Sequence, residues 1–299
     1  MKKLLALLLS VVMIASLAAC GGTEEQVDTI DSIGEIVMGF VPSQDAAEIA
    51  STVEPLRAEL EKQLGVPVKA EVVTDYNALS EGLKSKKIDI GFLPPFGYVK
   101  AEERANITVI LKAVRFGASS YRAQYNVPAD SDIQSIEDLV NTSGLVWAYG
   151  DNSSTSGFLF PANQLMSMGV ENLDDHFTQT TAGGHDNAIV ALLTGTADFA
   201  TTYEDARTRV EEDYPDVMDK VRVIGYSDPI PNDGIVVREG LSDELIASIK
   251  TAFLSFNDNE EMVQVLKDVY NWTGIAEASP ADYDIVRETY KIFKDSINE

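Results

Sequence analysis

The sequence predicts an α/β protein built from two lobes. Short apolar runs with strand character alternate with segments of helical periodicity along most of the 299 residues, and this order favours parallel sheets covered by helices. A turn, an aspartate and a short apolar strand occur twice in the same order, at residues 86–91 and 195–201. The chain is long enough for two lobes with separate cores, and its 45% hydrophobic content is ordinary for a globular protein.

The first half of the chain holds strands separated by two helices. Strand-like stretches are predicted at about 35–40, 66–73, 88–93, 107–115 and 121–127. Apolar residues recur every three or four positions over 49–64, which indicates a helix that a glycine and a proline terminate. Asp75 lies where its side chain can cap a second helix at about 75–85.

The second half continues the alternation and ends in helices. Strands are predicted at 145–149, 178–181, 221–226 and 235–238, and a short strand follows the turn and Asp198 within 195–201. A turn with a short helix is predicted at 130–141, further helices at 158–168, 185–194 and 203–213, and three closing helices at about 242–256, 259–270 and 280–297. Prolines fix the backbone of the loop at 227–234. No segment after Cys20 reaches membrane-spanning length.

The first twenty residues are typical of a secretion signal. Two lysines precede an apolar run at 4–18. The Leu-Ala-Ala-Cys ending at Cys20 resembles a bacterial lipobox, which implies cleavage before Cys20 and attachment of lipid, including palmitate; an ordinary export signal is the alternative. We predict a signal peptide at 1–19, a lipidated tether at 20–33 and a location on the extracellular or periplasmic face of the cell membrane. Cys20 is the only cysteine, so lipidation leaves none for disulfides or thiolate metal sites.

The charge of the chain is strongly negative. The 23 Lys and Arg residues face 48 Asp and Glu residues, which gives a formal net charge of −25. Removal of residues 1–19 takes two lysines, so 21 basic residues face 48 acidic ones and the charge becomes −27. This excess argues against nucleic acid or an anionic membrane surface as a partner. A small anion remains a compatible ligand because local donors can oppose the global field.

Residues 151–157, Asp-Asn-Ser-Ser-Thr-Ser-Gly, are the stretch around which the prediction is organised. They connect a predicted strand to a predicted helix. The first turn of a helix has unpaired amide groups, and its dipole favours negative charge. Hydroxyl side chains add hydrogen-bond donors without adding charge. The stretch therefore predicts either a helix cap alone or a helix cap that also binds an anion.

The sequence lacks the motifs of several enzyme classes. It contains no P-loop, no Gly-x-Gly-x-x-Gly, no His-Glu-x-x-His and no Gly-x-Ser-x-Gly. Of the two histidines, His176 is expected to be solvated. His185, beside Asp186, is a candidate triad partner for Ser154 or Ser156, but a run of equivalent hydroxyls is better suited to holding an anion than to attacking an ester. We predict a protein that is not an enzyme and uses no cofactor or metal.

Six stretches together resemble one family. They are Val41-Pro42-Ser43, Thr74-Asp75-Tyr76, residues 88–93, residues 152–157 with Pro161, Gly184-His185-Asp186 and residues 229–233. Over about residues 35–295 the chain resembles the phosphate, phosphite and phosphonate substrate-binding proteins of ABC importers. The resemblance implies a type II periplasmic-binding-protein fold, in which two crossover strands join two α/β lobes and the ligand lies in the cleft between them. It places lobe 1 at 34–126 plus 230–299 and lobe 2 at 127–229.

The resemblance also implies a set of ligand-binding residues. They are Tyr76, Tyr121, Ser154, Thr155, Ser156, His185, Glu204 and Asp233. The tyrosines would reach the ligand from the first lobe, and the three hydroxyl residues and the histidine would donate hydrogen bonds to phosphoryl oxygens. Asp233 would accept a proton or an amine of the ligand. Glu204, or its neighbour Asp205, would meet the organic part of the ligand.

The predicted function is that of a monomeric receptor, which captures a phosphonate, phosphite or related phosphorus oxyanion and delivers it to the permease and ATPase of an importer. The alternatives are a receptor for a sulfonate or a thiamine-related compound, a serine hydrolase, or a structural surface protein. Because the predicted site contains no Arg or Lys, we expect neutral donors beside Asp233 to disfavour a fully ionised ligand. Phosphate dianion should then bind poorly compared with phosphite or a phosphonate.

Overall fold

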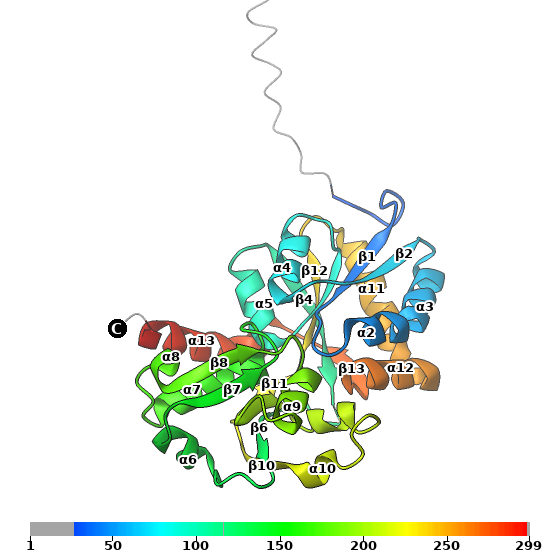
Figure 1. Cartoon of the computed structure of the whole chain (residues 1–299). Coiled ribbons are helices and arrows are strands. Elements are labelled where there is room, and N and C mark those ends of the chain that lie inside the picture. The colour runs from blue at the N-terminus through cyan, green and yellow to red at the C-terminus, as the bar shows by residue number, and fades with distance from the viewer. Residues whose placement is uncertain (1–26, 116, 298–299) are drawn as a thin grey trace, which may run out of the picture.

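The computed structural model describes residues 27–115 and 117–297, which fold into two lobes that each contain one large β-sheet (Figure 1). The predicted two-lobed α/β fold is therefore confirmed. The predicted signal peptide and the lipid attachment site at Cys20 lie outside the described residues. Every helix in the described part of the chain is too short or too polar to span a bilayer.

The first lobe contains a six-stranded sheet in the order β13-β4-β12-β3-β1-β2. Its strands are β1 (Ile36–Phe40), β2 (Val68–Val72), β3 (Ile90–Leu93), β4 (Ile107–Val114), β12 (Gly234–Arg238) and β13 (Gly274–Glu277). Strand β1 pairs in parallel with β2 and β3, whereas β12 runs antiparallel to β3 and β4. Helices cover the central strands on both faces, which explains why β1 and β3 are almost continuous apolar runs.

Helices pack on both faces of this first sheet. They are α2 (Ala46–Thr52), α3 (Glu54–Leu64), α4 (Tyr76–Lys84), α5 (Pro95–Glu102), α11 (Asp243–Ser255), α12 (Glu260–Tyr270) and α13 (Asp284–Ile297), with 3₁₀ turns at Phe256–Asp258 and Pro280–Tyr283. Helices α2, α3, α11 and α12 share one apolar cluster with the sheet, and α4 and α5 belong to a second cluster. Asp75 caps α4 by accepting a hydrogen bond from the amide of Ala78 at 2.9 Å, as the sequence predicts.

The second lobe contains a five-stranded sheet in the order β10-β6-β9-β7-β8. Its strands are β6 (Ala123–Pro128), β7 (Leu145–Tyr149), β8 (Phe177–Thr181), β9 (Phe199–Tyr203) and β10 (Val221–Tyr226). Its helices are α6 (Ile136–Asn141), a π-helix (Thr155–Leu159) that continues into α7 (Phe160–Ser167), α8 (Leu173–His176), α9 (His185–Leu193), a 3₁₀ helix (Ala206–Val210) and α10 (Val217–Lys220). Strand β7 lies between β8 and β9 and is parallel to both, so the carboxyl ends of these strands meet at one edge of the sheet.

The chain passes between the lobes at a short two-stranded pairing. Strand β5 (Ser120–Tyr121) pairs with β11 (Ile230–Pro231). The predicted lobe boundary at residue 126 falls inside β6, which pairs along its length with β9 and β10 of the second sheet. We therefore propose that the crossovers lie at β5 and β11 and that lobe 2 begins near residue 123.

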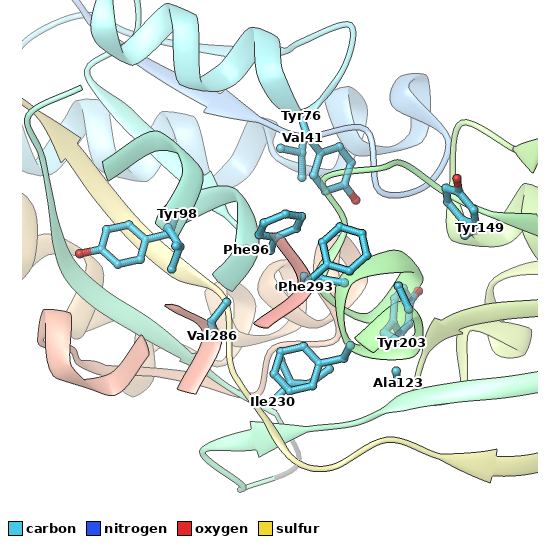
Figure 2. Close-up of a cluster of buried hydrophobic side chains, with 14 of the residues drawn as sticks. Val41, Tyr76, Phe96, Tyr98, Ala123, Tyr149, Tyr203, Ile230, Val286 and Phe293 are labelled. Atoms are coloured by element: carbon cyan, nitrogen blue, oxygen red, sulfur yellow. The ribbon is translucent and has the colours of Figure 1, made fainter. Parts of the chain in front are cut away.

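One cluster of buried side chains extends from the first lobe into the second. Figure 2 shows this cluster, with Phe96 from the first lobe and Tyr203 from the second. The C-terminal helix α13 contacts both lobes: the ring of Tyr290 meets Phe96 at a centroid distance of 4.8 Å, and Phe293 meets Phe158 at 5.5 Å. The two lobes are thus joined by apolar packing as well as by the two connections.

The sequence predictions differ from the structure at several elements. Helices α5, α8 and α10 were not predicted, and the single helix predicted over 49–64 is divided into α2 and α3. The predicted helix at 203–213 is wrong, because Tyr203 ends β9 and only Ala206–Val210 form a short 3₁₀ helix. Asp205 has a left-handed φ of 61°, which interrupts a regular helix at that position. Strand β13 was not predicted. The three closing helices are confirmed, with their boundaries shifted by a few residues.

Candidate ligand-binding site

A partly enclosed cavity lies between the two lobes, beyond the carboxyl ends of the parallel strands. Its volume is about 30 Å³, two to three times the ~10–15 Å³ that a single water requires. It is lined by Val41, Ser43, Gln44, Tyr76, Phe92, Pro94, Arg115, Tyr121, Ser154, Ser156, His185, Tyr203, Asp233, Tyr270 and Trp272. Loops that follow β1, β2, β3, β7 and β8 supply many of these residues, because neighbouring parallel strands end at the same edge of a sheet.

The start of the π-helix forms one wall of the cavity. The hydroxyl oxygen of Ser154 caps this helix by accepting a hydrogen bond from the amide of Gly157 at 3.0 Å. The amides of Thr155 and Ser156 have no acceptor in the described part of the chain. Unpaired amides at a buried helix start favour an anion. The capping and anion-binding interpretations of this stretch are therefore compatible.

His185 begins α9 and lies beside Ser154. Its Nε2 atom is 3.3 Å from the Ser154 hydroxyl oxygen, and its ring packs on Tyr203 at a centroid distance of 4.9 Å. Burial, with the positive charge of Arg115, lowers the pKa of His185 to about 3, so the imidazole is neutral near pH 7. When the Ser154 hydroxyl donates to Nε2, the Nδ1 atom carries the hydrogen. Nδ1 is buried and has no partner among the described residues.

Arg115 and Asp233 form an ion pair in the wall of the cavity. The Arg115 Nη2 atom donates to Asp233 Oδ2 at 2.6 Å, and both side chains are largely buried. The expectation that the site contains no Arg or Lys is therefore wrong. The cause is the register of β4 and β12: the amide of Ala113 bonds the Asp233 carbonyl, which makes Arg115 and Asp233 diagonal neighbours across the two strands.

Tyr76 and Tyr121 contribute hydroxyl groups, as the resemblance implies. Both are buried and line the cavity. Burial, together with the charge of Asp151, raises the pKa of Tyr76 well above its usual value, and burial with the charge of Asp233 raises the pKa of Tyr121. Both phenols therefore stay protonated near neutral pH and can donate hydrogen bonds to an anion.

Two of the predicted site residues lie outside the cavity lining. The Thr155 hydroxyl oxygen accepts a hydrogen bond from the amide of Phe96 in the first lobe, at 2.9 Å. The Glu204 carboxylate is bound by Arg122, with a shortest distance of 2.6 Å, and lines a neighbouring pocket. Asp205, the alternative to Glu204, pairs with Arg207 at 2.9 Å. Ligand contacts from the side chains of Thr155 and Glu204 therefore remain predictions.

Hydrogen bonds between the lobes close the cavity. In addition to the Thr155 bond, they run from the His185 amide to the Ser43 carbonyl (2.9 Å), from the Asp45 amide to Asp186 Oδ2 (3.1 Å) and from Lys100 Nζ to Ser153 Oγ (2.7 Å). These bonds involve the loops that carry the site. The same loops therefore hold the two lobes together and line the cavity.

Several lining residues were not predicted from the sequence. They are Gln44, Arg115, Tyr203, Tyr270 and Trp272. Tyr270 is the last residue of α12, and Trp272 lies two positions beyond it. The Tyr270 hydroxyl donates to the Val41 carbonyl at 3.0 Å. Only Tyr203 had a local signal, because it precedes the acidic pair that the resemblance singled out.

The described residues contain no cluster of three or more His, Cys, Asp or Glu side chains that could hold a metal ion. The serine and histidine of a hydrolase are adjacent, but the arrangement lacks the third member of a triad. Within residues 27–115 and 117–297, no carboxylate accepts a hydrogen bond from His185 Nδ1. The geometry is therefore that of a hydrogen-bonding cage and not of an activated nucleophile.

Comparison with known proteins relates this fold and cavity to transport receptors. Residues 38–283 match the family described as "ABC transporter, phosphonate, periplasmic substrate-binding protein". The chain is 28% identical to a phosphate-import protein of Mycolicibacterium smegmatis over 90% of each chain. It is also 28% identical to the phosphonates-binding periplasmic protein of Escherichia coli, over 77% of this chain and 68% of that one.

A solved structure shares the architecture. The binding-protein component of an ABC phosphonate transporter from Pseudomonas aeruginosa superimposes with a TM-score of 0.81 and 26% identity, over 88% of this chain and 87% of that one. The family match covers most of the chain, and the two lobes with a cavity between them agree with it. The chain belongs to the family of periplasmic substrate-binding proteins of phosphonate ABC transporters.

Proposed function

We propose that this protein is the receptor of an ABC importer, that it captures a phosphonate, phosphite or related phosphorus oxyanion between its lobes, and that it delivers the ligand to the membrane permease. The relatives named above support this proposal, since one is a phosphate-import protein and another a phosphonates-binding protein. The receptor acts as a monomer and catalyses no reaction. Ligand contacts made by both lobes favour the closed form.

One observation carries the proposal: buried donors without acceptors surround a small cavity. Arg115 Nε, His185 Nδ1 and Trp272 Nε1 belong to lining residues, and none of the three atoms has a partner in the described part of the chain. Buried polar groups are normally hydrogen-bonded, and an unpaired one costs about 1–3 kcal/mol. An oxyanion in the cavity would supply the acceptors, together with those for the amides of Thr155 and Ser156.

The charges of the lining residues cancel. Arg115 and Asp233 neutralise each other, and His185 is neutral. A charge-assisted hydrogen bond contributes about 1.5–3 kcal/mol, so several of them give micromolar affinity, about −8 kcal/mol, after desolvation. Because no net positive charge faces the ligand, the cavity favours an ion that keeps one proton. Calorimetry with phosphate should give weaker binding at pH 8 than at pH 6, and the opposite order would contradict this electrostatic argument.

A serine hydrolase is the second candidate, because Ser154 Oγ lies 3.3 Å from His185 Nε2. Two observations disfavour it. A general base works best with a pKa near the operating pH, whereas the pKa of His185 is about 3. The imidazole also has no carboxylate to orient it among the described residues.

We also propose that lipid attached to Cys20 anchors the receptor on the outer face of the cell membrane. The support comes from the sequence, in which an apolar run ends in Leu-Ala-Ala-Cys. The described residues begin at Val27, so a short segment would connect the lipid to the folded lobes. The anchor would keep the receptor near its permease.

Thermal unfolding with and without ligand tests the proposed function. At a methylphosphonate or phosphite concentration of ~100 times Kd, binding stabilises the folded chain by about 2.7 kcal/mol, a Tm increase of roughly 5–10 °C. Ser154→Ala and His185→Ala should each abolish the increase, whereas His176→Ala, which changes the other histidine, should retain it. A ligand-dependent Tm increase that persists in both Ser154→Ala and His185→Ala would contradict the proposed binding site. Hydrolysis of p-nitrophenyl acetate that depends on Ser154 would favour the hydrolase.

A further inference from the structure

The resemblance assigns Asp233 to a proton or an amine of the ligand and Glu204 to its organic part, and both carboxylates are already bound by arginines of this chain. Asp233 is paired with Arg115 at 2.6 Å, and Glu204 is paired with Arg122 at 2.6 Å. Arg122 also stacks on the ring of Tyr226, with its guanidinium carbon 4.0 Å from the ring centroid. A ligand ammonium group would therefore have to displace a guanidinium from either carboxylate.

Arg115 is held in place by several contacts. Its guanidinium carbon lies 4.9 Å from the ring centroid of Tyr121 and 5.5 Å from that of Tyr203. Its backbone is fixed by reciprocal hydrogen bonds with Ala118, at 3.1 and 2.8 Å. Removing it from Asp233 would leave a buried carboxylate unpaired, which is strongly unfavourable. Arg115 is therefore a fixed part of the cavity wall.

The position of Arg115 also limits the size of the ligand. Arg115 and Tyr121 line both the ligand cavity, of about 30 Å³, and a neighbouring pocket of about 380 Å³. The neighbouring pocket contains Glu204 and Asp205, the acidic side chains that would attract a cationic tail. Arg115 and Tyr121 thus lie between the proposed oxyanion position and the neighbouring acidic pocket. A ligand tail long enough to reach from the cavity into this pocket would meet the Arg115 guanidinium. An ammonium group at the end of the tail would be repelled by it.

The unpaired nitrogen of Arg115 gives the guanidinium a second role. Nη2 donates to Asp233, while Nε is buried and has no acceptor among residues 27–115 and 117–297. A guanidinium presents its donors in a rigid planar fork. One part of the group can therefore hold the carboxylate while Nε donates to an oxygen of the ligand.

We propose that Arg115 is a specificity-determining residue, which with Asp233 selects compact phosphorus oxyanions without an ammonium group and excludes aminoalkylphosphonates. The ligand class comprises phosphite, phosphate and methylphosphonate. This inference rests on the proposed function and adds a ligand class to it.

Calorimetry of the mature chain with three probes tests the inference. Phosphite or methylphosphonate should bind at least about 100-fold more tightly than 2-aminoethylphosphonate, because the like charge in the wall opposes the ammonium group. Equal or tighter binding of 2-aminoethylphosphonate would overturn the inference and leave the proposed function intact. Binding of none of the three would overturn both.

Substitutions separate the effect of Arg115 from that of cavity size. Arg115→Met exposes the Asp233 carboxylate to the ligand, so the preference over 2-aminoethylphosphonate should shrink at least about tenfold. The double variant Arg115→Met, Asp233→Asn leaves no buried charge unpaired. It should bind methylphosphonate, and its affinity for 2-aminoethylphosphonate should not increase. Arg287→Met breaks the ion pair with Glu102, which has the same 2.6 Å length and involves no residue of the cavity lining. This control should leave the ranking of the ligands unchanged. An unchanged ranking in Arg115→Met would overturn the role of Arg115.

Discussion

Replacement of His185 by glutamine should remove a defined part of the acid sensitivity of the fold. Burial, with the charge of Arg115, lowers the pKa of His185 to about 3, whereas histidine in an unfolded chain titrates near ~6.5. Between these values the unfolded chain binds a proton that the folded chain does not. The stability contributed by the neutral imidazole is therefore fully present above pH ~6.5 and is lost progressively as the pH falls towards 3.

The size of the effect follows from these two pKa values. Between pH 7.5 and pH 5.0, protonation of the unfolded imidazole lowers the free energy of unfolding by about 2 kcal/mol. The folded imidazole stays neutral at pH 5.0 for any folded pKa below about 4, so the figure depends little on the depth of the shift. An effect of this size is a large fraction of the stability of an ordinary domain.

Urea unfolding of the ligand-free protein and the His185→Gln variant, each at pH 7.5 and 5.0, measures this contribution. All other ionisable groups are the same in both proteins, so their effects cancel in the comparison. The unsubstituted protein should lose about 2 kcal/mol more free energy of unfolding than the variant. Equal losses would refute the reasoning, because they would show that the folded imidazole is charged or solvated at pH 5.0.

Three further substitutions test other parts of the structure. Gly157→Ala would place a methyl carbon 2.8 Å from the Ser154 hydroxyl oxygen, which caps the helix. In urea unfolding it should destabilise the fold by about 1–3 kcal/mol, and in calorimetry it should weaken ligand binding. Gly34→Ala, where a methyl group would enter open space, should have neither effect. Thr155→Val removes the hydroxyl oxygen that accepts a hydrogen bond from the Phe96 amide across the lobes. The unpaired buried amide costs ~1.4 kcal/mol, so the affinity for methylphosphonate should fall about tenfold. An unchanged Kd would contradict the role of this bond in holding the lobes closed. Cys20→Ser should move the protein from the membrane fraction to the medium or periplasmic extract, and retention in the membrane would exclude the lipid anchor.

Local sequence signals were sufficient for much of the fold. Helix caps at Asp75 and Ser154 depend on hydrogen bonds to amides three residues away, so a short stretch contains the information. The loops that carry Ser154 and His185 follow neighbouring parallel strands, and the alternation of strands and helices predicts such strands. The hydroxyl-rich stretch with Ser154 could therefore be recognised from the sequence alone. The ligand-binding roles of Ser154 and His185 came from the family resemblance and stay predictions.

The parts that were missed depend on long-range pairing. Arg115 reaches Asp233 only because β4 and β12 pair in one particular register, across 118 positions of the chain. The partner of Glu204 is Arg122, which lies 82 positions earlier in the chain. Charge in the site was therefore the weakest prediction. The hydroxyl residues of 151–157 are buried in the structure, and their role in anion binding stays a prediction.

A crystal structure of the mature protein with methylphosphonate tests the binding site most directly. The phosphorus atom should lie in the cavity between the lobes, with its oxygens accepting hydrogen bonds from the amides of Thr155 and Ser156 and from Arg115 Nε. The methyl group should face the Tyr121 side of the cavity, with the Arg115–Asp233 pair intact. A phosphonate bound elsewhere, or a cavity that holds only water at saturating ligand, would contradict the assignment.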